Sequence, residues 1–231
     1  MADLSITLGN KNYSSWSLRA WLVLQQTGAD FDEQVIPLRR PDSKARIRAV
    51  SPSGRVPLLR VRAGRRRWAI WDSLAIAEYL AERFPEAGLW PEEPGARATA
   101  RAVAAEMHAG FGALRTFMPM DFCRRHDAFG AKVRQASDVA ADIERIVEIW
   151  EDCRTRFGRK EGDFLFGGFG AADAAFAPVA SRFATYGVPL SGAAAAYRDA
   201  VLAWPPMRAW RRAAKAEPWV IAFPELRSFQ A

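Results

Sequence analysis

Two short stretches combine residue types that could bind a small, anionic, peptide-like ligand. In the run 56–59, Val-Pro-Leu-Leu, a proline heads an apolar strand, where it cannot donate a backbone hydrogen bond to a neighbouring strand. If the Val56–Pro57 bond is cis, the backbone of Val56 turns outward and can pair with a peptide. Asp72 and Ser73 open an amphipathic helix, so a hydroxyl, unpaired N–H groups and the positive end of the helix dipole can receive a carboxylate there.

The elements that must position these residues alternate between strands and helices. Apolar periodicity and turn residues predict the order strand, helix, strand, helix, strand, strand, helix, at residues 4–8, 14–28, 31–38, 42–50, 57–61, 68–71 and 73–84. The first βαβ unit implies a parallel pair of strands with a right-handed crossover. The ββα unit that follows adds an antiparallel pair.

A change in composition divides the chain. Residues 85–95 are rich in proline, glycine and glutamate, which predicts a linker between a domain of residues 1–84 and a domain of residues 96–231. The second part shows only helical patterns, with apolar residues three or four positions apart, as in Met107, Phe111, Leu114 and Met118. We therefore expect an all-helical second domain, with later helices near 172–186, 192–203 and 206–216.

The length and composition of the chain are typical of a soluble globular protein. Of 231 residues, 50% are hydrophobic and 26% are charged, and no apolar run reaches the roughly 18 residues of a membrane-spanning helix. The chain enters an alternating strand directly after Asp3, which is not the pattern of a secretory signal. We expect a cytoplasmic protein that does not bind membranes.

Charge and cysteine usage narrow the classes of ligand. The net charge is +7, and residues 1–84 hold 14 Lys and Arg against 8 Asp and Glu, a local excess of +6. No helix carries a basic stripe, so we expect no nucleic-acid partner and interpret this charge as steering for a small anion. Two cysteines and two histidines, at positions 123, 153, 108 and 126, lack the spacing of metal ligands, so we expect no metal.

Three motifs in this order resemble the glutathione transferase family. Val56–Pro57 is similar to the cis-proline step of that family, and residues 72–80, Asp-Ser-Leu-Ala-Ile-Ala-Glu-Tyr-Leu, are similar to its acidic-serine helix. Residues 164–173 are similar to the segment that opens the sixth helix of the family, although Gly170 replaces its usual Ser or Thr. The resemblance implies an α/β thioredoxin-like N-terminal domain followed by an all-α helical C-terminal domain.

The resemblance also implies a ligand and a set of contacts. Glutathione would be the co-substrate, with its cysteinyl part paired to the backbone of Val56 and its γ-glutamyl end held by Asp72 and Ser73. The other glutathione-binding residues that it implies are Ser14, Trp16, Arg55 and Pro57. The protein would then be a transferase acting on a small electrophilic substrate, as in detoxification, and a homodimer.

The thiol of glutathione must be activated, because at a pKa of about 8.5 only a few per cent is thiolate at neutral pH. The loop after the first strand contains no cysteine, so a mixed disulfide with glutathione there is excluded. Residues 14–19, Ser-Ser-Trp-Ser-Leu-Arg, resemble the S-S-C-S-x-R element of the zeta-type branch, which assigns the hydrogen bond to Ser14. The register of the theta-type branch assigns it to Ser15. Tyr13 is a third candidate, and capping of the helix is the simple structural alternative.

Two further questions stay open in the sequence. Trp16 stands where the zeta-type pattern has cysteine, so the choice between isomerase and transferase is undecided, and Trp16 could instead wall the substrate site. Phe111, Arg115 and Met118 have helical spacing and could line the pocket for the second substrate, although core packing would also explain Phe111. A non-catalytic scaffold with the same fold is the alternative function.

Overall fold

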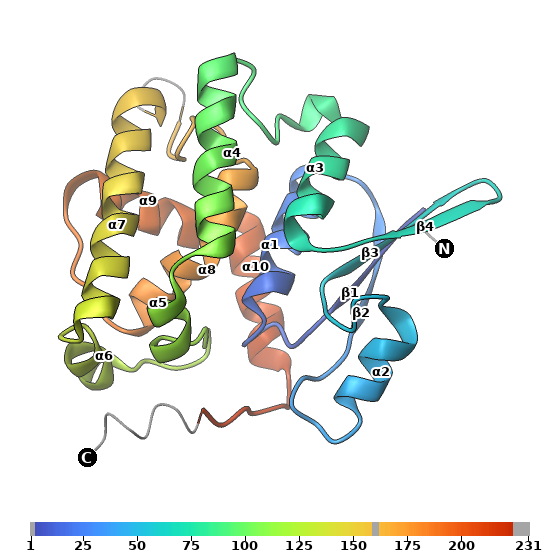
Figure 1. Ribbon diagram of the computed structural model, residues 1–231, viewed down its shortest axis with the longest axis horizontal. Coiled ribbons are helices and arrows are strands. Elements are labelled where there is room, and N and C mark those ends of the chain that lie inside the picture. Colours follow the sequence, from blue (N-terminus) through green and yellow to red (C-terminus); the bar gives the residue numbers. More distant parts are fainter. Residues whose placement is uncertain (1–2, 159–161, 224–231) are drawn as a thin grey trace.

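The computed structural model describes residues 3–158 and 162–223, and its N-terminal part is built on one mixed sheet (Figure 1). The strands are β1 (Leu4–Leu8), β2 (Phe31–Val35), β3 (Leu58–Ala63) and β4 (Arg66–Ile70). They lie in the order β2-β1-β3-β4, with β1 and β2 parallel and the other neighbours antiparallel. The predicted parallel pair and antiparallel pair are therefore confirmed.

Three helices accompany the sheet, α1 (Ser15–Gln26), α2 (Ser43–Val50) and α3 (Ser73–Arg83). Helix α1 lies between the sheet and the helical part of the molecule (Figure 1), and residues 17–24 of it are all buried. Helix α2 lies on the outer side and buries only Ser43 and Ile47. Because α1 packs against α3, α8 and α10, its N-terminus is held where the two parts of the molecule meet.

A short 3-10 turn (Pro85–Ala87) leads to the second part, which is helical. Its helices are α4 (Pro94–Ala109), α5 (Gly112–Phe117), α6 (Asp127–Val133), α7 (Ser137–Cys153), α8 (Ala171–Thr185), α9 (Gly192–Ala203) and α10 (Pro205–Ala216), with a π-helical turn at Arg154–Gly158. The predicted fold class, a thioredoxin-like α/β domain followed by a helical domain, is confirmed. In the described residues, no helix is both long enough and apolar enough to span a bilayer.

One predicted stripe does not form a single helix. Helix α4 ends at Ala109, Gly110 is extended, and Phe111 adopts a left-handed conformation with φ of 60° before α5 begins. The spacing from Met107 to Met118 therefore spans a break, so these residues do not share one helical face. This difference matters for the site, because Phe111, Arg115 and Met118 were expected to line it.

The start of α8 explains a departure from the family pattern. Helix α8 begins after Gly170, as the sequence predicts, and Asp173 accepts hydrogen bonds from the backbone N–H groups of Leu165 (3.0 Å) and Gly170 (2.9 Å). A Cβ atom at position 170 would lie 2.9 Å from the carbonyl oxygen of Leu89. Glycine stands there because a serine or threonine would collide with this neighbouring backbone.

Candidate functional site

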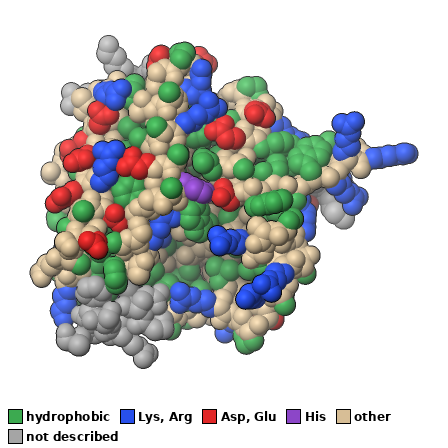
Figure 2. All heavy atoms as spheres, viewed as in Figure 1, with side chains coloured by type: hydrophobic (Ala, Val, Ile, Leu, Met, Phe, Trp, Pro, Cys, Tyr) green, Lys and Arg blue, Asp and Glu red, His purple; other side chains and the backbone are tan. Residues whose placement is uncertain are grey.

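A cleft of about 580 Å³ opens where the sheet domain meets the helical domain. Figure 2 shows this face of the molecule, with basic side chains, acidic side chains and one histidine gathered about the hollow between the two parts. The cleft is lined from α1, from the loop before β3, from the residues that precede α3 and from α4, by Trp16, Ser53, Arg55, Val56, Pro57, Trp71, Asp72 and His108.

Val56 is part of the wall of this cleft. The Val56–Pro57 bond is cis, Pro57 is buried, and β3 begins only at Leu58. Within the described part of the chain, neither the N–H nor the C=O of Val56 forms a backbone hydrogen bond. A peptide that enters the cleft can therefore pair with Val56 as an additional strand would.

The N-terminus of α3 meets the same cleft. Asp72 caps the helix by accepting a hydrogen bond from the N–H of Leu74 (3.0 Å), and the buried Ser73 is the first helical residue. The second carboxylate oxygen of Asp72 lies 3.2 Å from Nε2 of His108 on α4. An ammonium group can pair with Asp72, and a carboxylate can bind at the N-terminus of α3.

The two candidate serines occupy different positions at the start of α1. Ser14 is the N-cap, is 6% exposed, and donates its hydroxyl proton to Oγ of Ser17 (2.8 Å). Oγ of Ser17 also accepts the backbone N–H of Gly9 (2.9 Å). Ser15 is the first helical residue, is half-buried, and has no hydroxyl hydrogen bond among the described residues. The Ser14 donor is therefore in use within the protein, whereas the Ser15 hydroxyl has no partner among the described residues. Ser15 itself is not one of the residues that line the cleft; its helical neighbour Trp16 is.

Trp16 forms a braced wall of the cleft. The guanidinium of Arg19 lies 4.5 Å from its ring centroid and that of Arg115 lies 4.8 Å away, while the ring of His108 packs against it edge-on at 4.9 Å. Burial, assisted by repulsion from Arg115 and Arg182, lowers the pKa of Arg19 well below its ordinary value. These contacts fix the Trp16 ring and place positive charge behind it.

The predicted second-substrate residues occupy other places. Phe111 and Met118 are buried in the hydrophobic core, and Arg115 donates from Nη2 to the backbone carbonyls of Met107 and His108. None of the three belongs to the lining of the cleft in the described structure, and the burial of Phe111 fits the core-packing alternative. That the three line a second-substrate pocket stays a prediction. The helical spacing behind it is interrupted at the break between α4 and α5. Arg115 contributes indirectly, since it braces both Trp16 and the end of α4.

The structure adds three lining residues that the sequence did not single out, Ser53, Trp71 and His108. His108 is one of only two histidines in the chain, but no pattern in the sequence indicates that it lies beside Asp72. Of the predicted glutathione-binding residues, Trp16, Arg55, Val56, Pro57 and Asp72 line the cleft, and Ser14 and Ser73 lie buried at the ends of the adjoining helices.

Among residues 3–158 and 162–223, no group of three or more His, Cys, Asp or Glu side chains is arranged to hold a metal ion. The cleft instead offers backbone donors and acceptors, one carboxylate, one guanidinium and two helix N-termini. This set suits a flexible peptide that carries both carboxylates and an ammonium group.

Comparison with known proteins decides the family. The family model described as "Glutathione S-transferase, N-terminal domain" matches residues 13–83, and that described as "Glutathione S-transferase, C-terminal domain" matches residues 97–213. The chain belongs to the glutathione S-transferase family. Both matches fall on the two parts of the fold that frame the cleft, so the family assignment covers the candidate site as well as its scaffold.

Similar proteins include isomerases of this family. The chain is 32% identical over 125 residues to the maleylacetoacetate isomerase of Pseudomonas aeruginosa, covering 53% of this chain and 58% of that protein. It is 29% identical over 119 residues to a probable maleylacetoacetate isomerase of Caenorhabditis elegans, covering 51% of this chain and 53% of that protein. The matched stretch thus spans only a little over half the length of these curated relatives.

Solved structures agree on the fold. The structure of a maleylacetoacetate isomerase from Anaeromyxobacter dehalogenans, with glutathione bound in its active site, superposes with a TM-score of 0.66. The alignment covers 94% of this chain and 99% of that chain at 22% sequence identity. At this identity the superposition establishes the shared architecture alone.

Proposed function

We propose that this glutathione S-transferase family member is a glutathione-dependent enzyme that activates the thiol of glutathione for attack on an electrophilic carbon. The observation that carries the proposal is the backbone of Val56, which has no backbone partner among the described residues and shares one cleft with the N-terminus of α3. Val56 would pair with the cysteinyl part of glutathione. Asp72 would pair with the γ-glutamyl ammonium group, and Ser73 with the helix N-terminus would bind its carboxylate.

Thiol activation requires a donor at the start of α1. Lowering the thiol pKa by two units takes about 2.7 kcal/mol of preferential thiolate stabilisation. The hydroxyl of Ser15 supplies a hydrogen bond and the N-terminus of α1 supplies positive potential. Ser14 supports this by capping the helix, because its own donor is directed to Ser17. The serine is a hydrogen-bond donor in this scheme and forms no covalent bond.

The outcome of the attack depends on the electrophile. Where the attacked carbon carries a leaving group, its departure completes a transfer to glutathione. Where the thiolate adds to a double bond, later elimination restores glutathione and leaves an isomer. The maleylacetoacetate isomerases among the relatives favour isomerisation, whereas Trp16, at the position of the zeta-type cysteine, favours a different substrate shape.

Binding and thiol ionisation test this function in one pair of measurements. Calorimetry should show glutathione binding, and the dipeptide Cys-Gly should bind far more weakly because it lacks the γ-glutamyl group that reaches Asp72 and Ser73. Thiolate absorbance of the complex should titrate well below the free thiol. Conversion of an unsaturated dicarboxylic acid with glutathione conserved would identify an isomerase, and loss of glutathione a transferase.

If glutathione binds without any shift in its thiol pKa, the non-catalytic scaffold is the function that remains. If glutathione does not bind, both the enzyme and the glutathione-binding scaffold are overturned. The homodimer and the cytoplasmic location remain predictions. Sedimentation velocity tests the first, with a dimer expected at twice the chain mass of 25.7 kDa.

A further inference from the structure

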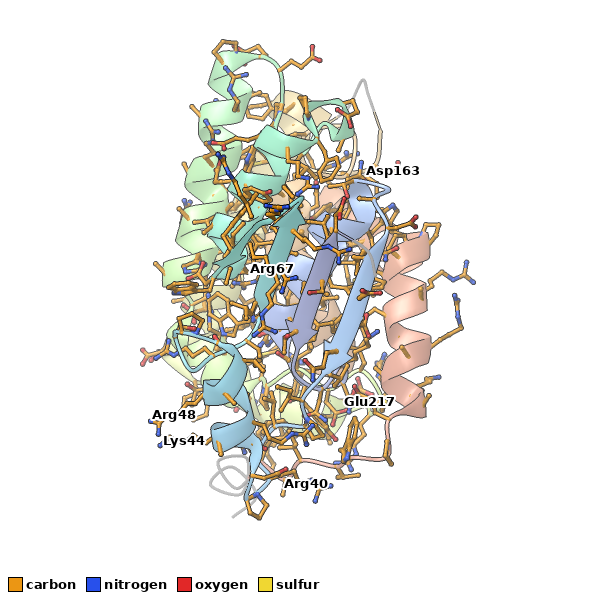
Figure 3. All side chains as sticks on the ribbon, turned by 90° about the vertical axis from the view of Figure 1, so that its right-hand side faces the viewer. Arg40, Lys44, Arg48, Arg67, Asp163 and Glu217 are labelled. Carbon is orange, nitrogen blue, oxygen red and sulfur yellow. The ribbon has the colours of Figure 1, made fainter. Side chains whose placement is uncertain are left out.

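The loop that precedes the serine pair is held by the helical domain. The backbone N–H of Lys11 donates to Oε1 of Glu217 (2.7 Å), and the N–H of Asn12 donates to Oε2 of the same carboxylate (3.2 Å). Glu217 follows the end of α10, about two hundred residues away in sequence, and Figure 3 shows it beside the end of the sheet. One carboxylate thus satisfies two consecutive donors that belong to no helix or strand.

The other polar groups of Lys11 are also occupied. Its carbonyl accepts the indole N–H of Trp210 on α10 (2.8 Å), and its ammonium pairs with Glu33 at 2.6 Å. The ammonium also lies over the rings of Trp21 and Trp210, 5.3 and 5.2 Å from their centroids. Lys11 is therefore almost fully buried and fixed from several sides.

Asn12 is fastened to the helical domain through its side chain. Its amide donates to Oδ1 of Asp121 (3.0 Å), and its amide oxygen accepts the backbone N–H of Cys123 (3.0 Å). The loop then turns back on itself, since the N–H of Ser14 donates to the carbonyl of Asn10 (2.8 Å). This bond ties the N-cap of α1 to the loop that Glu217 holds.

We infer that Glu217 is a positioning residue that sets the geometry of the thiol-activating serines from the opposite domain. This inference rests on the proposed function, because it assigns Glu217 a role in the activation that Ser15 and the N-terminus of α1 perform. Glu217 is not among the residues that line the cleft. It fixes two backbone N–H groups two and three residues before Ser14, where a shift of about 1 Å can cost up to 100-fold in rate.

The test compares Glu217→Gln and Glu217→Ala with a matched control, Glu93→Ala. Glu93 also accepts two consecutive backbone N–H groups, those of Gly95 and Ala96, but it does so at the start of α4. We expect Glu217→Ala to lower kcat about tenfold or more, to raise the pKa of the bound glutathione thiol, and to accelerate amide exchange in residues 11–16. Glu217→Gln, which keeps one acceptor oxygen, should lie between, while Glu93→Ala should lower stability without these effects.

Unchanged thiol pKa and unchanged loop exchange in Glu217→Gln would overturn the inference, as would equal kcat losses in the Glu93 and Glu217 variants. If Glu217→Ala does not fold, Glu217→Gln carries the test. Failure of the proposed function is separable, because amide exchange in the loop reports on the Glu217 contacts even if the wild-type protein binds no glutathione.

Discussion

Ser14 and Ser15 are neighbours in sequence, but the start of α1 gives their hydroxyls different surroundings. Ser14 caps the helix and donates to Ser17, so Ser14→Ala should lower the stability of the protein by about 1 kcal/mol. Ser15→Ala should instead raise the pKa of the bound thiol and lower kcat/KM by about 100-fold, with little change in stability. Chemical unfolding and thiolate titration of the two variants, each against wild type, distinguish these roles. The reverse pattern would assign the donor to Ser14.

At the level of single residues, the sequence predicted most of the cleft-lining residues whose position depends on local backbone geometry. Val56, Pro57 and Asp72 were predictable because a proline step and an N-cap are local features, and all three line the cleft. His108 was not predictable in this way. Its place beside Asp72 and Trp16 depends on how α4 packs against the sheet domain, which no local pattern encodes.

Among the helices and strands, those with a clear local pattern were predicted, and the break between α4 and α5 was not. Periodicity located β1 because apolar residues alternate at positions 4, 6 and 8, and it located α3 and α9 because each of these helices buries one face. The stripe from Met107 to Met118 failed because apolar residues on both sides of a helix break can keep helical spacing by chance. Phe111 occupies a left-handed conformation that glycine usually takes, so the residue type gave no warning of the break.

Asp173 at the start of α8 yields a prediction about stability. Replacing it with alanine removes the acceptors of two N–H groups, that of Leu165, which is buried, and that of Gly170, which is half-buried. We expect a loss of about 2–4 kcal/mol in the free energy of unfolding at pH 7. Asp173→Asn keeps the shape and one acceptor oxygen, so it should lose less. Urea unfolding of the three proteins measures both differences, and a loss below about 1 kcal/mol for alanine would contradict the expectation.

The same residue predicts a pH dependence. Burial raises the pKa of Asp173 to about 6, against the opposing effect of its backbone hydrogen bonds. Since the unfolded value is about 3.9, the native state binds the proton more tightly, and the contribution of Asp173 to stability falls as pH rises from about 4 to about 6. The difference in the free energy of unfolding between wild type and Asp173→Asn should therefore fall between pH 4.5 and pH 7, as measured at pH 4.5, 5.5 and 7. Parallel curves would refute it.

For the whole molecule, the contacts that join the two domains were the part hidden from the sequence. The order of elements and the family motifs gave the architecture, because they follow from patterns a few residues long. The bonds from Glu217, Trp210 and Asp121 to the loop at Lys11 and Asn12 join positions that are far apart along the chain. No periodicity relates such positions, so only the packed structure reveals that the second domain holds the loop that precedes the serine pair.

The uneven charge of the molecule leads to a prediction about ligand capture. The sheet domain carries nearly all of the net charge, with Arg55 in the cleft and Arg40, Lys44 and Arg48 on and beside α2 (Figure 3). Glutathione is an anion at neutral pH, so this field should favour its approach and its binding. Raising the salt concentration from about 0.02 to about 0.3 M shortens the Debye length to a few ångströms, and we expect the Kd to rise roughly threefold.

Removal of charge from one domain at a time shows whether the field of the sheet domain is responsible. A variant with Arg40, Lys44 and Arg48 changed to serine should bind more weakly at low salt and lose part of the salt dependence. Its matched control changes Arg208, Arg211 and Arg212 on α10, which removes the same charge from the helical domain and should leave the salt dependence near that of wild type. Salt screens distant charges more strongly than near ones. If both variants changed the Kd and its salt dependence equally, net charge alone, and not the position of the charges, would govern binding.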